Sequence, residues 1–210
     1  NFWEMGETGP CGPSSELFYD YGPDVGPDGG PANPDAEHRY VEIWNLVFQQ
    51  YFRGADGTLT DLPAKNIDTG AGMERILAVL AGSPSLYSAD VLARLVSEAE
   101  SITGQVLGAS ELSDIALRLL ADHTRTATFL VADGVVPSNE DRGYVVRRII
   151  RRAVRFAYML DVERQVMAPL VQRCIEVMGG AYPELVEGRE RIIEMINREE
   201  EGFRRTLARG

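Results

Sequence analysis

Residues 68–76, Asp-Thr-Gly-Ala-Gly-Met-Glu-Arg-Ile, combine two glycines with a carboxylate and an arginine. Gly70 and Gly72 would let a ligand approach the backbone, and a helix beginning after them would direct its N–H groups at an anion. The guanidinium of Arg75, in the first turn of that helix, suits a phosphate, and the carboxylate of Asp68 suits an ammonium group. Because short glycine patterns are weak signals, a plain strand-to-helix corner with a surface Glu-Arg pair is the alternative interpretation.

A second candidate site lies on a strand expected over residues 40–51. Alternation along this strand places Asn45, Val47 and Gln49 on one face. An amide beside a small apolar side chain is typical of a pocket for a small polar ligand. An asparagine on a half-exposed sheet face explains the same pattern equally well.

Cys11 and His123 belong to reactive residue types, but their surroundings favour packing roles. Cys11 lies in the Gly- and Pro-rich stretch 3–15 with no histidine nearby, which is typical of a buried small hydrophobe. His123 lies close to the apolar stripe of a helix. The sequence has no Ser/His/Asp order, no paired-carboxylate site and no Cys/His spacing for a metal, so no metal site is predicted.

A basic candidate site lies on a helix expected over residues 138–160. The stretch 142–155 contains six arginines and no acid. At about 100° per residue, five of them share an arc of roughly 140°: Arg147, Arg148, Arg151, Arg152 and Arg155. Such a face repels itself unless an anion covers it, which favours a phosphate backbone as partner. Pairing with acidic residues elsewhere, such as those of the last helix, is the alternative, and each interpretation can hold for different arginines.

Two kinds of scaffold must position these residues. Turn formers dominate residues 1–39, where only 17–19 suggest a strand. After them we predict a hairpin, formed by the strand over 40–51 and a turn at 55–57. A helix over 73–81 should follow the hairpin. Beyond residue 84 the pattern is helical only. The expected longer helices are 110–131, 138–160 with Ser138 as its cap, 169–178 and 184–207. We therefore predict a mixed domain over 1–84 and a helical domain over 85–210.

Composition limits the class of protein. The 210 residues are 44% hydrophobic and 25% charged, which is globular rather than disordered composition. No apolar run approaches the roughly 18 residues of a membrane span, and two cysteines favour a reducing, cytoplasmic location over a disulfide scaffold. The net charge of −11 hides an uneven distribution, since residues 1–42 hold nine acids and one arginine while 142–155 hold no acid.

Several long strings together resemble the alanyl-tRNA synthetase family, a class II aminoacyl-tRNA synthetase. They are residues 1–6 (Asn-Phe-Trp-Glu-Met-Gly), 8–13 (Thr-Gly-Pro-Cys-Gly-Pro), 42–48 (Glu-Ile-Trp-Asn-Leu-Val-Phe), 68–76, 121–123 (Ala-Asp-His) and 132–153. The resemblance implies an α+β fold. In it, the C-terminal part of an antiparallel-sheet catalytic core, residues 1–84, precedes an all-helical tRNA-recognition domain, residues 85–210.

The resemblance also implies roles for the candidate residues. The family activates alanine with ATP to alanyl-adenylate and transfers it to the 3′ end of alanine tRNA. Asp68 and Arg75 match its catalytic positions, with Gly70, Gly72 and Arg75 at the ATP. The positions that match the alanine pocket are Trp3, Asn45, Val47, Asp68 and Gly70. Asn139 matches the position that reads the acceptor-stem G·U pair, and the arginine face would meet the stem phosphates. ATP would bring Mg²⁺, and no zinc site is expected here.

Departures from the family pattern are small within the chain. Ser14 stands where the family usually has a second cysteine, and Ala71 where it has methionine. The family's first two signature motifs, its editing domain and its oligomerisation region have no counterpart, so we expect an internal segment that alone lacks ATP–pyrophosphate exchange. Two alternatives remain: a synthetase-like RNA-binding module, and a paralogue that loads alanine on another carrier, which Asn139 and the arginine face disfavour.

Overall fold

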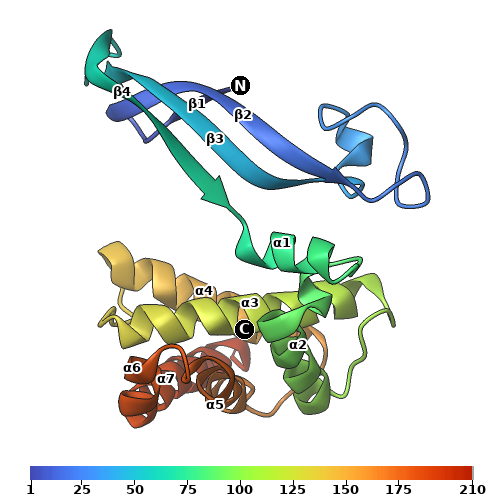
Figure 1. Ribbon diagram of the computed structural model, residues 1–210. Helices are drawn as coiled ribbons and strands as arrows, with labels where there is room; N and C mark the ends of the chain where they lie inside the picture. The colour runs from blue at the N-terminus through green and yellow to red at the C-terminus, as the bar shows by residue number, and fades with distance from the viewer. Residues whose placement is uncertain (210) are drawn as a thin grey trace. The chain divides into compact units, whose positions relative to one another are not determined.

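The computed structural model describes residues 1–209 and divides between Ala89 and Asp90 into two compact units. The first unit contains the β-strands, and the second is built from α-helices (Figure 1). The fold is α+β, as predicted.

The first unit is built on a four-stranded antiparallel sheet in the order β1-β2-β3-β4 (Figure 1). Its strands are β1 (Phe2–Glu4), β2 (Gly9–Asp20), β3 (Tyr40–Arg53) and β4 (Leu59–Ala71). The β-branched and aromatic residues that predicted a strand over 40–51 lie in β3. The predicted hairpin to β4 is confirmed, with Gly57 at φ 81° in its turn and Gly54 N donating to Thr58 O at 2.9 Å.

The prediction of loops over most of residues 1–39 is wrong for β2. Glycine and proline mark a bulge here rather than a loop, because the pairing of β2 with β3 shifts register between Cys11 and Ser14. At Gly12 the two backbones approach so closely that a Cβ would lie 2.0 Å from the carbonyl oxygen of Phe48. Only glycine fits this position.

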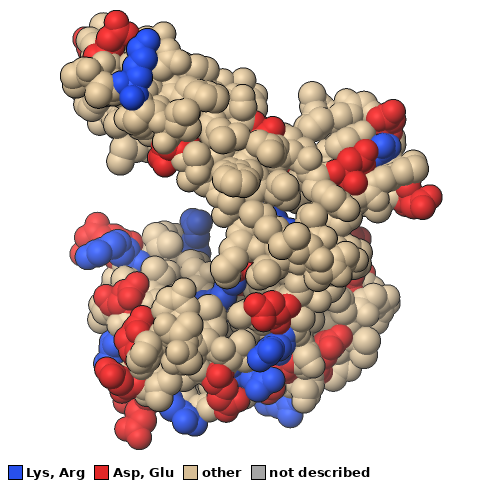
Figure 2. All heavy atoms as spheres, viewed as in Figure 1, with Lys and Arg blue, Asp and Glu red and all other residues tan. Residues whose placement is uncertain are grey.

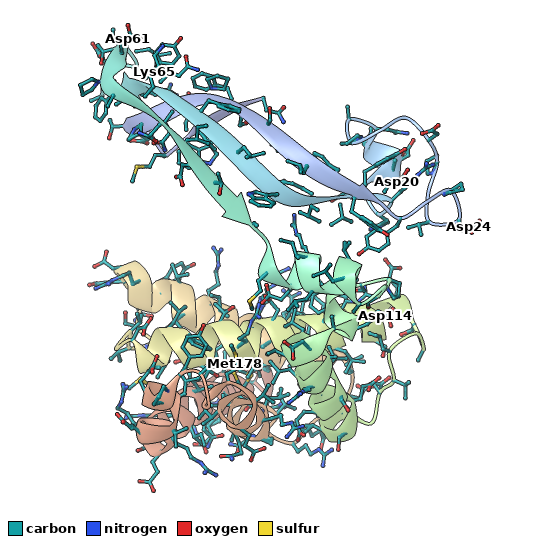
Figure 3. The ribbon with its side chains drawn as sticks, in the orientation of Figure 1. Asp20, Asp24, Asp61, Lys65, Asp114 and Met178 are labelled. Atoms are coloured by element: carbon teal, nitrogen blue, oxygen red, sulfur yellow. The ribbon has the colours of Figure 1, made fainter. Side chains whose placement is uncertain are left out.

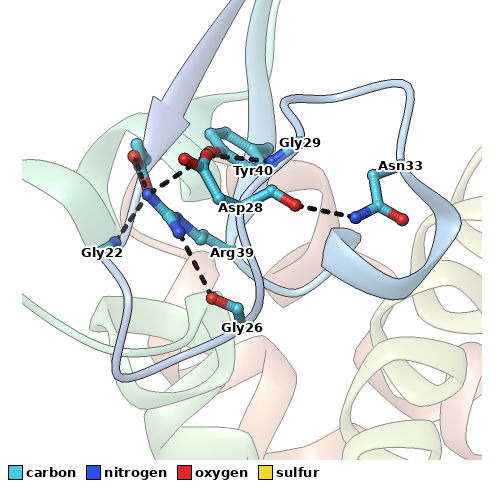
Figure 4. Close-up of polar contacts among 8 residues, drawn as sticks. Gly22, Gly26, Asp28, Gly29, Asn33, Arg39 and Tyr40 are labelled. Carbon is cyan, nitrogen blue, oxygen red and sulfur yellow. Dashed lines mark hydrogen bonds and ion pairs between the residues drawn. The ribbon is translucent and has the colours of Figure 1, made fainter.

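Residues 21–39, with the short 3₁₀ helix η1 (Pro34–Ala36), form a loop tied to its own ends (Figure 4). Arg39 donates from Nε and Nη2 to the two carboxylate oxygens of Asp20, at 2.6 and 2.9 Å, and from Nη1 to Gly26 O at 3.4 Å. The hydroxyl of Tyr40 donates to Asp28 at 2.8 Å. The hydrogen bond from Arg39 lowers the pKa of Asp20 to about 2, so this carboxylate stays ionised and anchors the loop.

The second unit packs its helices around an apolar core, with α3 in contact with α2, α4, α5, α6 and α7. After α1 (Met73–Leu80) and η2 (Leu86–Ser88) of the first unit, its helices are α2 (Asp90–Thr103), α3 (Glu111–Ala132), α4 (Asp141–Met159), α5 (Met167–Met178), α6 (Pro183–Glu187) and α7 (Arg189–Leu207). Side chains such as Leu95, Leu120, Ile150 and Ile196 are fully buried. Ser110 caps α3 by accepting from Ser113 N at 3.1 Å.

Two details of the predicted helices are wrong. Ser138 does not cap α4, because its hydroxyl bonds within the loop, to the N–H and carbonyl of Glu140, and the helix begins only at Asp141. The helix expected over 184–207 is interrupted at Gly188, which ends α6 and precedes α7. The first error arises because the Ser138 side chain satisfies backbone groups within the loop. The second arises at a glycine, which is a weak helix former.

A buried carboxylate joins α7 to the start of α5. Glu200 is fully buried, and its Oε1 accepts from Val166 N at 3.0 Å and from Arg204 Nε at 2.8 Å. Its Oε2 accepts from Met167 N at 2.8 Å. Glu200 therefore satisfies backbone N–H groups at the beginning of α5, where no residue of α5 itself provides a side-chain cap.

Candidate functional site

Strand pairing brings four of the predicted pocket residues together on the sheet. Asn45 of β3 lies opposite Gly70 of β4, and Val47 lies opposite Asp68. Residues directly opposite on antiparallel strands share a face, and so do residues two apart on one strand. Val47 is buried, whereas Asp68 is exposed on the edge strand. The arrangement is a small apolar floor with polar groups around it.

The Asn45 amide has a defined orientation. Its Nδ2 donates at 3.2 Å to Oε1 of Glu16, which lies opposite it on β2. Because a carboxylate only accepts, the amide nitrogen must face Glu16 and the oxygen must face away. Oδ1 is buried and has no hydrogen-bond partner among residues 1–209. An unsatisfied buried acceptor costs about 1–3 kcal/mol, so a ligand that reaches this atom would gain by donating an N–H group to it.

Sequence reasoning missed Glu16, because its proximity to Asn45 depends on a strand register that the sequence does not state. Gly70 leaves open space above the sheet, since a Cβ there would meet no heavy atom within 4 Å. Trp3 lies on β1 opposite Gly12, so β2 stands between it and β3 in the sheet. The pairing therefore unites Asn45, Val47, Asp68 and Gly70 directly, but not Trp3.

Arg75 is held at the end of the sheet, beside the turn from β4 into α1. Gly72 N donates to Ile43 O at 3.1 Å, which fixes this corner, and Arg75 Nη1 donates to Glu42 O at 2.7 Å. The guanidinium is exposed and keeps further N–H groups for an anion. Gly72 provides no side-chain cap for α1, so N–H groups of its first turn are left for solvent or a ligand.

The second unit carries the predicted RNA-contacting residues on α4 and the loop before it. Asn139 is exposed, and its Oδ1 accepts from Arg147 Nη1. Gly143 lets this loop lie against α4, because a Cβ there would be 2.4 Å from the carbonyl oxygen of Val136. Between the loop and α7 lies a hollow of about 630 Å³, the loop hollow, whose lining includes Asn139, Arg147, Arg191, Arg198 and Arg205.

The arginine face of α4 divides into two sets. Arg147 and Arg151 both donate from Nε to Oε1 of Glu199 on α7, at 3.0 and 2.7 Å. Arg148, Arg152 and Arg155 are exposed, and within the described chain no carboxylate lies within ion-pair distance of them. Pairing with the last helix thus explains two arginines and leaves three for another anion.

A second hollow, of about 510 Å³, lies along this face. It is lined by Arg148, Arg151, Arg152, Arg155, Phe156 and Phe203. Arg151 stacks over the Phe203 ring, 5.1 Å from its centroid. In the view of Figure 2, basic and acidic side chains are interspersed over the helical unit, so net charge alone does not reveal these positions.

Cys11 and His123, which were interpreted as packing residues, lie in largely buried positions. Cys11 is fully buried. The His123 side chain is 18% exposed, with Nδ1 3.2 Å from Oδ2 of Asp122, and this hydrogen bond lowers the pKa of Asp122. Across residues 1–209, no group of three His, Cys, Asp or Glu side chains could hold a metal ion. No helix in the same range is long and apolar enough to cross a bilayer.

Comparison with known proteins identifies relatives over the whole chain. Residues 1–210 match the family described as tRNA synthetases class II (A). The chain is 50% identical over 211 residues to the alanine–tRNA ligase of Acidithiobacillus ferridurans, 51% over 211 residues to that of Methylococcus capsulatus and 50% over 212 residues to that of Chlorobaculum tepidum. Each comparison covers 100% of this chain and 24% of the relative, so the chain spans about a quarter of their length.

Proposed function

Since the chain belongs to the class II (A) tRNA synthetases, we propose that it forms part of an alanine–tRNA ligase. The complete enzyme would condense alanine with ATP to alanyl-adenylate and then transfer alanine to the 3′ end of its tRNA. The names of the relatives from Acidithiobacillus ferridurans and Methylococcus capsulatus support this substrate. The first unit would contribute to the aminoacylation site, and the second would recognise the tRNA acceptor stem.

The observation that carries the proposal is the unsatisfied Asn45 Oδ1, with Asp68 on the same face of the sheet. An α-ammonium group has three N–H donors and a positive charge, which these two acceptors match. Val47, buried on β3 opposite Asp68, would meet the methyl group of alanine. A small apolar pocket rejects glycine and serine weakly, so accuracy would need a further editing step.

ATP would lie at the corner that contains Gly70, Gly72 and Arg75. The open space above Gly70 allows a close approach to the backbone, and the uncapped start of α1 and the tethered Arg75 supply donors for phosphate oxygens. Mg²⁺ would arrive with the ATP as part of the substrate. These groups would act by positioning and by stabilising charge on the phosphates, without a covalent protein intermediate.

The acceptor stem would lie along α4. Arg148, Arg152 and Arg155 are exposed and within reach of phosphates, whereas Arg147 and Arg151 are engaged by Glu199. Asn139 would contact a base edge, as the G·U reading position of the family implies. Replacing Arg148 and Arg152 with glutamine should weaken binding of an acceptor minihelix and flatten its salt dependence by about 0.9 per lost phosphate contact.

The amino-acid site is tested in a chimera. These 210 residues replace the matching segment of the Methylococcus capsulatus relative, and alanine-dependent ATP–pyrophosphate exchange is measured. Asp68→Asn should raise the KM for alanine about 10- to 100-fold, because a hydrogen bond to a charged group contributes about 1.5–3 kcal/mol. Asp61→Asn is the control, since Asp61 lies on the same strand near the hairpin turn (Figure 3). An equal response of the two variants would contradict the assignment. The isolated 210 residues should show no exchange.

A further inference from the structure

Glu199 of α7 holds two arginines of α4 through one oxygen atom. Its Oε1 accepts from Arg147 Nε at 3.0 Å and from Arg151 Nε at 2.7 Å. The Glu199 side chain is 16% exposed, and those of Arg147 and Arg151 are 25% and 33% exposed. Partial burial strengthens charge-assisted hydrogen bonds relative to pairs in open solvent, so both guanidinium groups are constrained.

Arg147 transmits this constraint to Asn139. Its Nη1 donates to Oδ1 of Asn139, on the loop that α4 follows. A guanidinium has donors only, so the Asn139 atom that faces it must be the oxygen, and the NH₂ group must point away from Arg147. The chain of contacts from Glu199 through Arg147 therefore determines which end of the Asn139 amide is presented to a ligand in the loop hollow.

We propose that Glu199 is a positioning residue for reading the acceptor stem. By holding Arg147, it orients the Asn139 amide so that its N–H donors meet an acceptor atom on a base edge. The inference rests on the proposed function, because Asn139 must contact RNA for the orientation to matter. Glu199 also withholds Arg147 and Arg151 from phosphates, which favours contacts that depend on base identity over contacts that do not.

Removing Glu199 should lower the discrimination between base pairs and, at the same time, steepen the salt dependence of binding. This combination distinguishes a positioning role from a loss of folding. Glutamine would keep the one oxygen that accepts from both arginines, so the test uses Glu199→Ala, which leaves no side-chain acceptor. In this variant Arg147 and Arg151 are released and can bind phosphates, so the salt slope of binding should steepen by up to about 0.9 for each released arginine. Discrimination between base pairs should fall at the same time. A variant that simply unfolds the helical unit would weaken binding to every RNA and flatten the slope.

The matched control is Glu194→Ala. Glu194 lies on the same helix, lines the same loop hollow and is exposed, with no ion pair to an arginine among the described residues. Both substitutions remove one negative charge from the hollow, so they change its overall potential alike. Only Glu199→Ala releases Arg147.

The first experiment needs no RNA. With ¹⁵N-asparagine labelling of the chain, the side-chain NH₂ signals of Asn139 are assigned by their loss in Asn139→Ala. They should shift in Glu199→Ala and in Arg147→Gln but not in Glu194→Ala. Unshifted Asn139 signals in the folded Glu199→Ala chain would overturn the inference, whatever RNA it binds.

The second experiment titrates two acceptor minihelices that differ only in a G·U or G·C pair. If the wild-type chain prefers the G·U helix, Glu199→Ala should lose about fivefold or more of that preference, while its salt slope steepens. A fivefold loss corresponds to about 1 kcal/mol, the smallest contribution expected of one base-edge contact. Glu194→Ala should keep the preference. Retained preference in Glu199→Ala overturns the inference. A wild-type chain without preference contradicts the proposed reading role of Asn139 instead, and the Asn139 signals then decide the inference alone.

Discussion

Glu200→Gln should destabilise the helical unit far more than the same substitution at the neighbouring Glu201. Glu200 is fully buried and accepts from two backbone N–H groups and from Arg204. Glu201 is exposed, and its Oε1 accepts only from the side chains of Gln165 and Asn197. The two substitutions are chemically identical, so their difference measures the buried network.

The magnitude follows from the contacts. Glutamine keeps one oxygen, so its NH₂ must face either Met167 N or the pair formed by Val166 N and Arg204 Nε. At least one backbone donor then loses its acceptor, at about 1–3 kcal/mol, and Arg204 loses its charged partner. Breaking one partner of a buried ion pair costs about 3–5 kcal/mol. We expect the free energy of unfolding to fall by about 3 kcal/mol in Glu200→Gln and by about 0–1 kcal/mol in Glu201→Gln.

Urea unfolding followed by circular dichroism at 222 nm measures the difference. The helical signal reports mainly on the second unit, and an unchanged m-value would show that the folded and unfolded states expose the same surface in each variant. Equal midpoints for Glu200→Gln and Glu201→Gln would refute the reasoning. A change in slope rather than midpoint would mean that the two units no longer unfold as they do in the parent chain.

Three further predictions concern the first unit and Cys174, a buried cysteine of α5. Gly12→Ala should prevent normal pairing of β2 with β3, because its Cβ would clash with the carbonyl of Phe48, and amide hydrogen exchange in both strands should accelerate. Asp20→Asn should lower stability at neutral pH. Its pKa is lowered from 3.8 to about 2, so the wild-type advantage exists above pH 3.8 and disappears as the pH falls towards 2, which urea unfolding across that range checks. Burial raises the pKa of Cys174 to about 11, so iodoacetamide at pH 8 should modify it only in the unfolded chain.

The sequence predicted those parts of the fold in which local pattern and tertiary structure agree. Tyr40 to Arg53 is a strand because β-branched and aromatic residues dominate it, and α3 begins after Ser110 because the serine hydroxyl caps it. Residues 17–19 were predicted as a strand and lie in β2, but the rest of β2 was missed because its glycines and prolines are typical of loops. Their role here is to permit a bulge and a close approach to β3, which depends on a partner strand more than thirty residues away.

The candidate amino-acid site was predictable in its residue types but not in its geometry. Asn45 and Val47 follow from alternation along one strand. The orientation of the Asn45 amide does not, because it depends on Glu16, which reaches it through the register of a different pair of strands. Whether an amide presents its oxygen or its nitrogen decides what it can bind, so the choice of an ammonium ligand required the structure.

The arginine face shows why helical periodicity alone overestimates the number of arginines that are available to bind a ligand. A 100° rotation per residue places five arginines in one arc and treats them alike. Packing against α7 then brings a single carboxylate, Glu199, to two of them, and this depends on the rotation and offset of a helix fifty residues further along the chain. Three arginines rather than five remain for phosphates, so the salt slope of RNA binding along this face should be near 2.7 instead of 4.5 at about 0.9 per contact. The net charge of −11 and the local run of arginines are therefore both poor guides to affinity, because an anion binds the cationic side chains that folding leaves unpaired.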